Sequence, residues 1–297
     1  MSGAIDLHGR VAIVTGAGRG LGHSHARALA ARGASVVVSD LDLVAAEAVC
    51  ADITAGGGDA MACGANVTDV AAVEAMCAAV KSRCGRIDIL VNNAGIVRDK
   101  SFAKMDLAAF SLVLDVHLRG AAICTMAVWP IMRAQKYGRV IFTTSPAGLY
   151  GNFGQANYAA AKMGLVGLMQ TLSIEGLRDD IRVNCLSPVA ATAMTDAVFS
   201  AEDLALLDPA LVSPAVVALA SQDAPTRAIV TAGAGCFGTA HVTMSPLTYL
   251  GDADDAAELV LSCVKADASA HDTTPSSAEA QWLAALPLAR SSQTEQA

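Results

Sequence analysis

Aromatic and charged side chains are scarce in this sequence: Phe, Trp and Tyr make up 4% of the 297 residues, and Asp, Glu, Lys and Arg 16%. Few aromatic rings leave few platforms on which nucleic-acid bases could stack. The formal net charge of -8 adds repulsion from phosphates, so we expect no nucleic-acid partner. Hydrophobic residues reach 54%, as in a chain that folds around a sizeable core.

The eight cysteines form no Cys-x-x-Cys pair, and several lie within apolar stretches. We interpret them as reduced core thiols, which suits a cytoplasmic protein. His23 and His25 are separated on a helix by their spacing, so we expect no metal site. No basic patch precedes an apolar stretch at the start, and the apolar run 121–132 is short and contains Pro130. We therefore expect neither a signal peptide nor a membrane partner.

Short β-branched runs alternate with longer alanine-rich stretches along most of the chain. The runs predict buried strands at 10–15, 35–40, 59–65, 87–92, 138–144, 181–187 and 227–233. The stretches have the 3.6-residue apolar recurrence of helices, at 20–32, 42–55, 69–84, 106–135 and 156–178. This alternation predicts a Rossmann-type α/β fold, a doubly wound parallel sheet of about seven strands with helices on both faces.

The composition changes after about residue 240. A loose linker is expected at 266–280, with helices at 253–265 and 278–286. We therefore predict a dinucleotide-binding domain over 1–240, which also carries the catalytic residues, and a C-terminal extension over 241–297 without an assigned role.

Four glycines, Gly16, Gly18, Gly20 and Gly22, lie between the first predicted strand and the first predicted helix. Glycines there permit a tight turn and a close approach of the backbone to a pyrophosphate at the helix N-terminus. Asp40 ends the second strand about twenty residues later, where an acid can hold ribose hydroxyls. The segment therefore predicts a dinucleotide site.

Tyr158 and Lys162 lie four residues apart in a predicted helix, so their side chains share one face. A free phenol has a pKa near 10, too high for a base at neutral pH. An ammonium about 4 Å away contributes roughly 4 kcal/mol at an effective dielectric constant of about 20. We therefore expect Lys162 to lower the pKa of Tyr158 by about three units, into the range of general acid–base catalysis.

Together these residues resemble the short-chain dehydrogenase/reductase family, over roughly residues 7 to 240. The resemblance rests on the glycine spacing, on the Asn-Asn-Ala-Gly motif at 92–95, and on Ser145, which precedes Tyr158 by thirteen residues. It implies that Tyr158 is the general acid–base, that Ser145 holds the substrate oxygen and that Lys162 also binds the nicotinamide ribose. It implies these cofactor-binding residues: Gly16, Gly18, Arg19, Gly20, Leu21, Gly22, Asp40, Asn66, Val67, Asn93, Ala94, Gly95, Tyr158, Lys162, Pro188 and Thr192.

Two positions depart from the family pattern. The family often has an asparagine that supports a water relay to the lysine, and here that position is His117. We include His117 among the candidate catalytic residues, while a core histidine without a role stays open. The usual Pro-Gly after the sixth strand is Pro188-Val189, and the resemblance places Pro188 and Thr192 beside the nicotinamide.

Within the family, the stretches 92–102, 116–121, 135–140 and 150–165 resemble the (R)-3-hydroxyacyl-CoA dehydrogenase domain of peroxisomal multifunctional enzyme type 2 and its bacterial relatives. This predicts interconversion of a secondary alcohol and a ketone on a fatty or steroid side-chain CoA thioester. A 3-oxoacyl-ACP reductase and a hydroxysteroid dehydrogenase are alternatives. A non-catalytic dinucleotide-binding scaffold or sensor is the alternative from another class.

Three further expectations concern ligands and assembly. Arg19 resembles the basic residue of NADP-dependent relatives, but Asp40, followed by Leu41 and Asp42, favours NAD as the cofactor. The basic residues Arg98, Lys100 and Lys104 either form a solvated face or meet the phosphates of CoA. The helices predicted at 106–135 and 156–178 correspond to the family's subunit interface, so we expect a homodimer or homotetramer.

Overall fold

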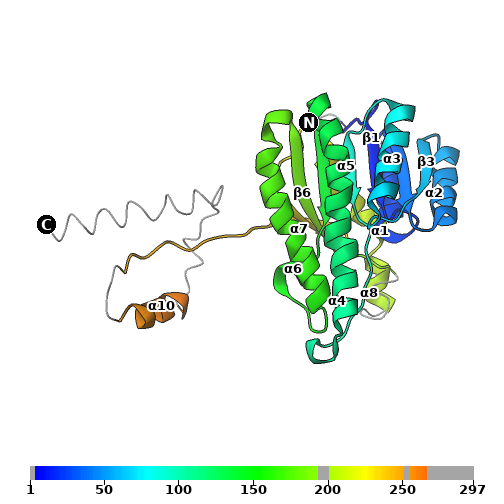
Figure 1. Cartoon of the computed structure of the whole chain (residues 1–297). Helices are drawn as coiled ribbons and strands as arrows, with labels where there is room; N and C mark the ends of the chain where they lie inside the picture. Colours follow the sequence, from blue (N-terminus) through cyan, green and yellow to red (C-terminus); the bar gives the residue numbers. More distant parts are fainter. Residues whose placement is uncertain (1–3, 193–200, 251–254, 266–297) are drawn as a thin grey trace. The chain divides into compact units, whose positions relative to one another are not determined.

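The computed structural model describes residues 4–192, 201–250 and 255–265, and the chain divides into two units, Met1–Ala240 and His241–Ala297. The first unit is built on one sheet with the strand order β3-β2-β1-β4-β5-β6-β7-β8 (Figure 1). The strands are β1 Val11–Thr15, β2 Ser35–Asp40, β3 Asp59–Gly64, β4 Ile89–Asn92, β5 Gly138–Thr143, β6 Ile181–Pro188, β7 Ile229–Gly233 and β8 Cys236–Ala240. Neighbours pair in parallel as far as β7, which confirms the predicted Rossmann-type fold.

The strand β8 was not predicted, and it pairs antiparallel with β7 at the edge of the sheet. Its residues are mostly exposed, so it lacks the apolar run that marks a buried strand. The turn before it consists of Ala234 and Gly235, with φ angles of 49° and 75°. Two positive φ angles are what a two-residue hairpin turn requires.

Helices cover both faces of the sheet. They are α1 Gly20–Ala30, α2 Leu43–Ala55, α3 Val70–Cys84, α4 Leu107–Leu114, α5 Gly120–Gln135, α6 Pro146–Tyr150, α7 Ala156–Glu175, α8 Ala201–Leu206 and α9 Ser213–Ala220. One core cluster includes α3, α5 and α7, which lie in front of the sheet in Figure 1, and the other includes α1, α2 and α9. Residues of β1 alternate between the clusters, with Ile13 in one and Val14 in the other.

Aspartates fix the starts of three helices. The carboxylates of Asp42, Asp69 and Asp106 each accept a hydrogen bond from the backbone N–H three residues later. Such capping satisfies one of the N–H groups that a helix start leaves without a partner, and it contributes roughly 1 kcal/mol. The predicted helices at 42–55, 69–84 and 106–135 therefore start one residue early, at the capping residue itself.

The predicted helix 106–135 is not continuous. After α4 ends at Leu114, a π-helical turn runs over Asp115–Arg119, and α5 begins at Gly120. Such turns insert one residue into a helix and occur often at functional sites. This one holds His117 in the interior, with 2% of its surface exposed.

The stretch Leu107–Gln135 is also long and apolar enough, by length and composition, to cross a membrane. However, its residues Cys124, Val128 and Met132 are at most 1% exposed and belong to the core cluster between α3, α5 and α7. Core helices of globular proteins have the same composition. We therefore interpret α5 as a core helix, whereas the described residues of α4 bury only Val113 and leave Leu107 and Leu112 exposed.

The amino ends of the central strands are held by a buried arginine. Arg139, which is 0% exposed, donates through Nε to the carbonyl of Ser221 at 2.9 Å and through a terminal nitrogen to that of Gln222 at 2.9 Å. Its guanidinium also lies 4.1 Å from the centroid of the Tyr137 ring. These bonds tie β5 to the segment that leads into β7. They lie at the amino ends of the strands, away from the predicted site.

In the second unit, the helix α10 Ala256–Lys265 lies within the helix predicted at 253–265. Residues 253 and 254, the predicted linker and the predicted helix at 278–286 lie outside the described residues.

Candidate active site

The glycine-rich loop folds tightly against the residues that follow β4. Gly16 has a φ of +62°, and a Cβ on it would lie 2.7 Å from Cα of Ala94. Thr15 closes this contact, because its hydroxyl oxygen accepts hydrogen bonds from the backbone N–H groups of Asn93 at 3.0 Å and Ala94 at 3.1 Å. A Cβ on Gly22 would lie 2.2 Å from the carbonyl oxygen of Gly16. Two glycines of the motif are thus required by the packing of the loop itself.

Asp40 lies directly beside this loop. Its Oδ2 accepts a hydrogen bond from the N–H of Gly18 at 2.8 Å, and its Oδ1 accepts one from the N–H of Asp42 at 3.0 Å. The side chain is therefore fixed, yet a carboxylate retains lone pairs for further donors such as ribose hydroxyls. Arg19 is exposed and caps α1 without a side-chain hydrogen bond to the helix.

The remaining predicted cofactor residues lie around the carboxyl ends of the strands. Asn93 donates to the carbonyl of Gly16 at 3.1 Å, and a Cβ on Gly20 would lie 3.4 Å from the methyl group of Thr192. Pro188 is the last residue of β6, Leu21 packs against the core, and Val67 is buried. Asn66 is exposed, and its side-chain Oδ1 accepts a hydrogen bond from the N–H of Thr68 at 3.0 Å, so the side chain stabilises the local turn.

Ser145 follows the carboxyl end of β5 by two residues. Tyr158 and Lys162 both lie in α7. Ser145 caps α6, and its Oγ accepts from the N–H of Ala147 at 3.2 Å. Lys162 is 3% exposed, and its Nζ lies 5.4 Å from the centroid of the Tyr158 ring. The Nζ donates to the carbonyl of Thr143 at 2.6 Å. The four-residue spacing therefore places tyrosine and lysine on one face of α7, with Lys162 buried and Tyr158 half-buried.

The expected lowering of the Tyr158 pKa by Lys162 is wrong, because the pKa of Tyr158 is raised. Burial lowers the pKa of Lys162 to about 7, so its charge is only partly present at neutral pH. Burial raises the pKa of Tyr158, a hydrogen bond with Ser145 lowers it in part, and the charge of Asp99 raises it further. Desolvation is the largest cause of both shifts, and the ammonium of Lys162 is directed to the carbonyl of Thr143.

His117 lies between the loop after β4 and Tyr158. Its Nε2 is 3.0 Å from the nitrogen and 2.7 Å from the oxygen of the Ile96 backbone. Its ring meets the Tyr158 ring edge-on, at 5.1 Å between centroids and 87° between planes. Burial and the charge of Lys162 lower the pKa of His117 to about 3, so the imidazole is neutral near neutral pH. A Cβ on Gly95 would lie 2.2 Å from Cε1 of His117, which explains the glycine of the motif.

Sequence reasoning missed the hydrogen bonds between residues 98–100 and the start of α7. Asn157 donates through Nδ2 to the carbonyl of Arg98 at 3.1 Å, and Gln155 donates through Nε2 to Oδ2 of Asp99 at 2.7 Å. The N–H of Lys100 donates to the carbonyl of Gly154 at 2.9 Å. The only signal in the sequence is the presence of two polar side chains, Gln155 and Asn157, shortly before Tyr158.

The residues present fit a nicotinamide dinucleotide. The glycine loop leaves its backbone open beside the N-terminus of α1, and Asp40 is fixed at the rim of that loop. Tyr158 and Lys162 lie at the neighbouring strand ends, where open parallel sheets bind their ligands. Among the described residues, no group of His, Cys, Asp and Glu could hold a metal ion. Fold and site together define a dinucleotide-dependent oxidoreductase.

Comparison with known proteins gives the family. The model of the short chain dehydrogenase family matches residues 10–203, and the chain belongs to this family. It is an oxidoreductase that acts on CH–OH groups.

Three proteins show which members of the family this chain resembles. The peroxisomal hydratase-dehydrogenase-epimerase of Saccharomyces cerevisiae is 45% identical over 248 residues, which are 80% of this chain and 27% of the yeast protein. The structure of full-length peroxisomal multifunctional enzyme type 2 from Drosophila melanogaster superposes with a TM-score of 0.80 at 33% identity, covering 96% of this chain and 50% of that one. The 3-oxoacyl-[acyl-carrier-protein] reductase of Synechocystis sp. is 45% identical over 192 residues, 64% of this chain and 78% of the reductase. The chain thus spans about a quarter of the length of its yeast relative.

Proposed function

We propose that this chain oxidises (R)-3-hydroxyacyl-CoA thioesters, with fatty or steroid side-chain acyl groups, to the 3-oxoacyl thioesters. The observation that carries this proposal is the similarity to the multifunctional peroxisomal enzymes, which extends over 80% of the chain in the yeast relative. Ser145, Tyr158 and Lys162 supply the groups that alcohol oxidation requires.

The chemistry assigned to these side chains follows from their positions. The Ser145 hydroxyl orients the substrate oxygen toward the phenol of Tyr158. The Tyr158 oxygen accepts the hydroxyl proton in oxidation and returns it in reduction. Lys162 and Asp40 bind ribose hydroxyls, and the glycine loop binds the pyrophosphate. When bound there, the dinucleotide supplies the acceptor or donor of a hydride.

His117 acts in this proposal as a positioning residue. A neutral imidazole that is bonded to the backbone of Ile96 and packed edge-on against Tyr158 fixes the angle of the phenol ring. Its Nδ1 is buried without a partner among the described residues, so it remains available to a bound water or ligand.

The second candidate substrate is a 3-oxoacyl thioester on acyl carrier protein, which the similarity to the Synechocystis reductase favours. A substrate panel separates the candidates: the same acyl group on CoA and on acyl carrier protein, together with a free hydroxysteroid and a free sugar alcohol. Absorbance of the reduced cofactor follows each reaction. We expect the CoA thioester to have the highest kcat/KM. Turnover of only the free alcohols would contradict the proposed substrate class.

We also propose NAD as the cofactor, since Asp40 offers acceptors to ribose hydroxyls and its charge opposes a 2′-phosphate. The kcat/KM with NAD should exceed that with NADP by at least about tenfold, the value of one charge-assisted hydrogen bond. Asp40→Ala should narrow this ratio. Asp52→Ala, which removes an exposed acid from α2, is the control and should leave the ratio unchanged. A wild-type protein that prefers NADP side by side would overturn the assignment of Asp40.

We further propose a homodimer or homotetramer that is formed through α4, α5 and α7. Apolar side chains such as Leu107 and Met126 are 77% and 74% exposed on these helices. Light scattering at micromolar concentration decides this, and a monomer would contradict it. We propose a cytoplasmic location on the free cysteines of the described residues, and cell fractionation tests it.

A further inference from the structure

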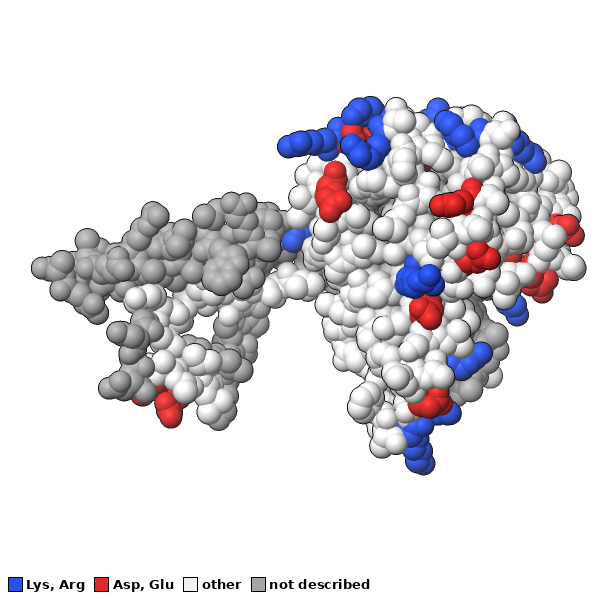
Figure 2. All heavy atoms as spheres, in the orientation of Figure 1, with Lys and Arg blue, Asp and Glu red and all other residues white. Residues whose placement is uncertain are grey.

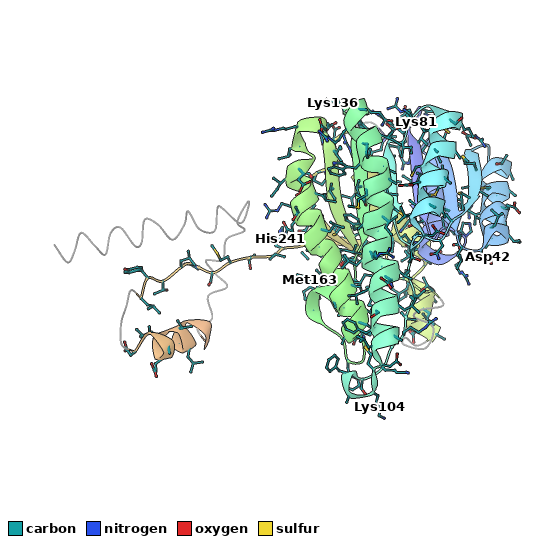
Figure 3. All side chains as sticks on the ribbon, in the orientation of Figure 1. Asp42, Lys81, Lys104, Lys136, Met163 and His241 are labelled. Atoms are coloured by element: carbon teal, nitrogen blue, oxygen red, sulfur yellow. The ribbon has the colours of Figure 1, made fainter. Side chains whose placement is uncertain are left out.

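The loop 96–106, which follows β4, carries three exposed basic side chains beside the active site, although the chain as a whole has a net charge of -8. Lys100 forms an ion pair with Asp106 at 3.4 Å, and Arg98 donates to the carbonyl of Val97 at 2.7 Å. Lys104 makes no ion pair within the described part of the chain. Figure 2 shows basic side chains at the lower tip of the first unit, where Figure 3 labels Lys104.

This loop is fixed relative to the catalytic tyrosine. Arg98 and Lys100 are bonded to the start of α7 through their backbones, whereas Asp99 is bonded through its side chain. The carboxylate of Asp99 is thus engaged by Gln155, and the two flanking basic side chains remain at the surface. Because Asn157 directly precedes Tyr158, the basic residues are held at a set place beside the reacting centre.

Two exposed phenylalanines accompany the basic side chains. Phe102, in the same loop, is 76% exposed, and Phe153 is 91% exposed. Phe153 precedes Gly154, whose carbonyl accepts the hydrogen bond from Lys100. Only six phenylalanines occur in the chain, so two such rings at one place offer faces on which a purine can stack.

We propose that Arg98 and Lys104 bind the phosphates of a CoA thioester and that Phe102 and Phe153 stack on its adenine. Cations and aromatic faces are the two features that recognise a nucleotide of this kind. The long pantetheine arm separates the phosphates from the reacting carbon, so the nucleotide end lies at the rim while the alcohol reaches Tyr158. This subsite rests on the proposed function, since it names the carrier of the same substrate.

The test compares one 3-hydroxyacyl group on CoA with the same group on pantetheine, which lacks the nucleotide. In Arg98→Ala/Lys104→Ala, the ratio of kcat/KM for the CoA ester to that for the pantetheine ester should fall about tenfold, because each exposed charge contact contributes a few-fold. Phe153→Ala should lower the ratio by about threefold or more. The wild-type KM for the CoA ester should rise with ionic strength, and this rise should be smaller in the double variant.

Lys81→Ala is the control, because it removes an exposed lysine that lies at the opposite end of the first unit from Lys104 (Figure 3). An unchanged ratio in the double variant, an equal loss with both esters, or the same fall in Lys81→Ala would overturn the subsite. Isothermal titration calorimetry of free CoA with the NAD-loaded protein measures binding at the subsite without turnover. Weaker CoA binding in the double variant supports the subsite even if no CoA ester reacts, in which case only the proposed reaction fails. Equal binding overturns the subsite.

Discussion

Tyr158→Phe is expected to reduce kcat by at least about a hundredfold, the range for a lost general acid–base. In the proposed reaction the phenol oxygen takes the substrate proton, whereas a phenyl ring keeps the packing against His117 but cannot accept a proton. Affinity for the cofactor should remain, since the glycine loop and Asp40 are untouched. Steady-state kinetics and a fluorescence titration with reduced cofactor measure the two effects separately.

The rate of oxidation is also expected to depend on pH, in a direction that the pKa of Tyr158 determines. Tyr158 must be unprotonated to accept the proton, and burial raises its pKa, so the wild-type rate should rise with pH in the alkaline range. The residual rate of Tyr158→Phe should lose this rise. Tyr137→Phe is the control, because the buried Tyr137 hydroxyl has no partner among the described residues and Tyr137 lies at the amino end of β5, away from Tyr158. Near-normal turnover in Tyr158→Phe would refute the assigned role.

Gly22→Ala is expected to weaken cofactor binding by about one to two orders of magnitude. A Cβ at this position would lie 2.2 Å from the carbonyl oxygen of Gly16 and 2.9 Å from Cα of Ala17, both of them backbone atoms. The loop must therefore shift, at a cost of roughly 1–3 kcal/mol, a typical value for overpacking. Because the same loop forms the pyrophosphate cradle, the shift should appear as a higher dissociation constant for the cofactor.

The control for this variant is Gly56→Ala. Gly56 has a φ of -79°, and a Cβ there would lie 3.4 Å from the carbonyl oxygen of Ile53, an ordinary van der Waals contact. The melting temperature and the far-ultraviolet circular dichroism of both variants separate a local shift from unfolding. A folded Gly22→Ala protein with unchanged cofactor affinity would show that the cradle tolerates the methyl group.

The strands of the sheet were predictable because parallel strands are buried on both faces and appear in the sequence as unbroken apolar runs. The run at 35–40 coincides with β2 Ser35–Asp40 to the residue. The short helices α6, α8 and α9 have too few residues to establish a period, and the exposed strand β8 lacks an apolar run, so the sequence did not indicate them.

The candidate site likewise has features that the sequence predicts and features that it does not. The glycine loop and the Tyr158–Lys162 pair are local in sequence, so their spacing predicts their geometry. The bond between Gln155 and Asp99 joins residues 56 positions apart, and no local pattern marks it. The pKa of Tyr158 depends on burial by the whole surrounding core, which a comparison of two residues does not include. The prediction therefore located the charge of Lys162 and missed the cost of removing both groups from water.

The π-helical turn at Asp115–Arg119 makes the length of this segment as important as its composition. An α-helix turns by about 100° per residue, so one extra residue rotates everything beyond it by that angle. Before the turn α4 packs against α7, and after it α5 packs against β4 and β5. Deleting a single residue would close the turn into an ordinary helix and would rotate one of these two faces away from its partner. Substitutions in this segment are therefore easier to accommodate than a change in the number of its residues.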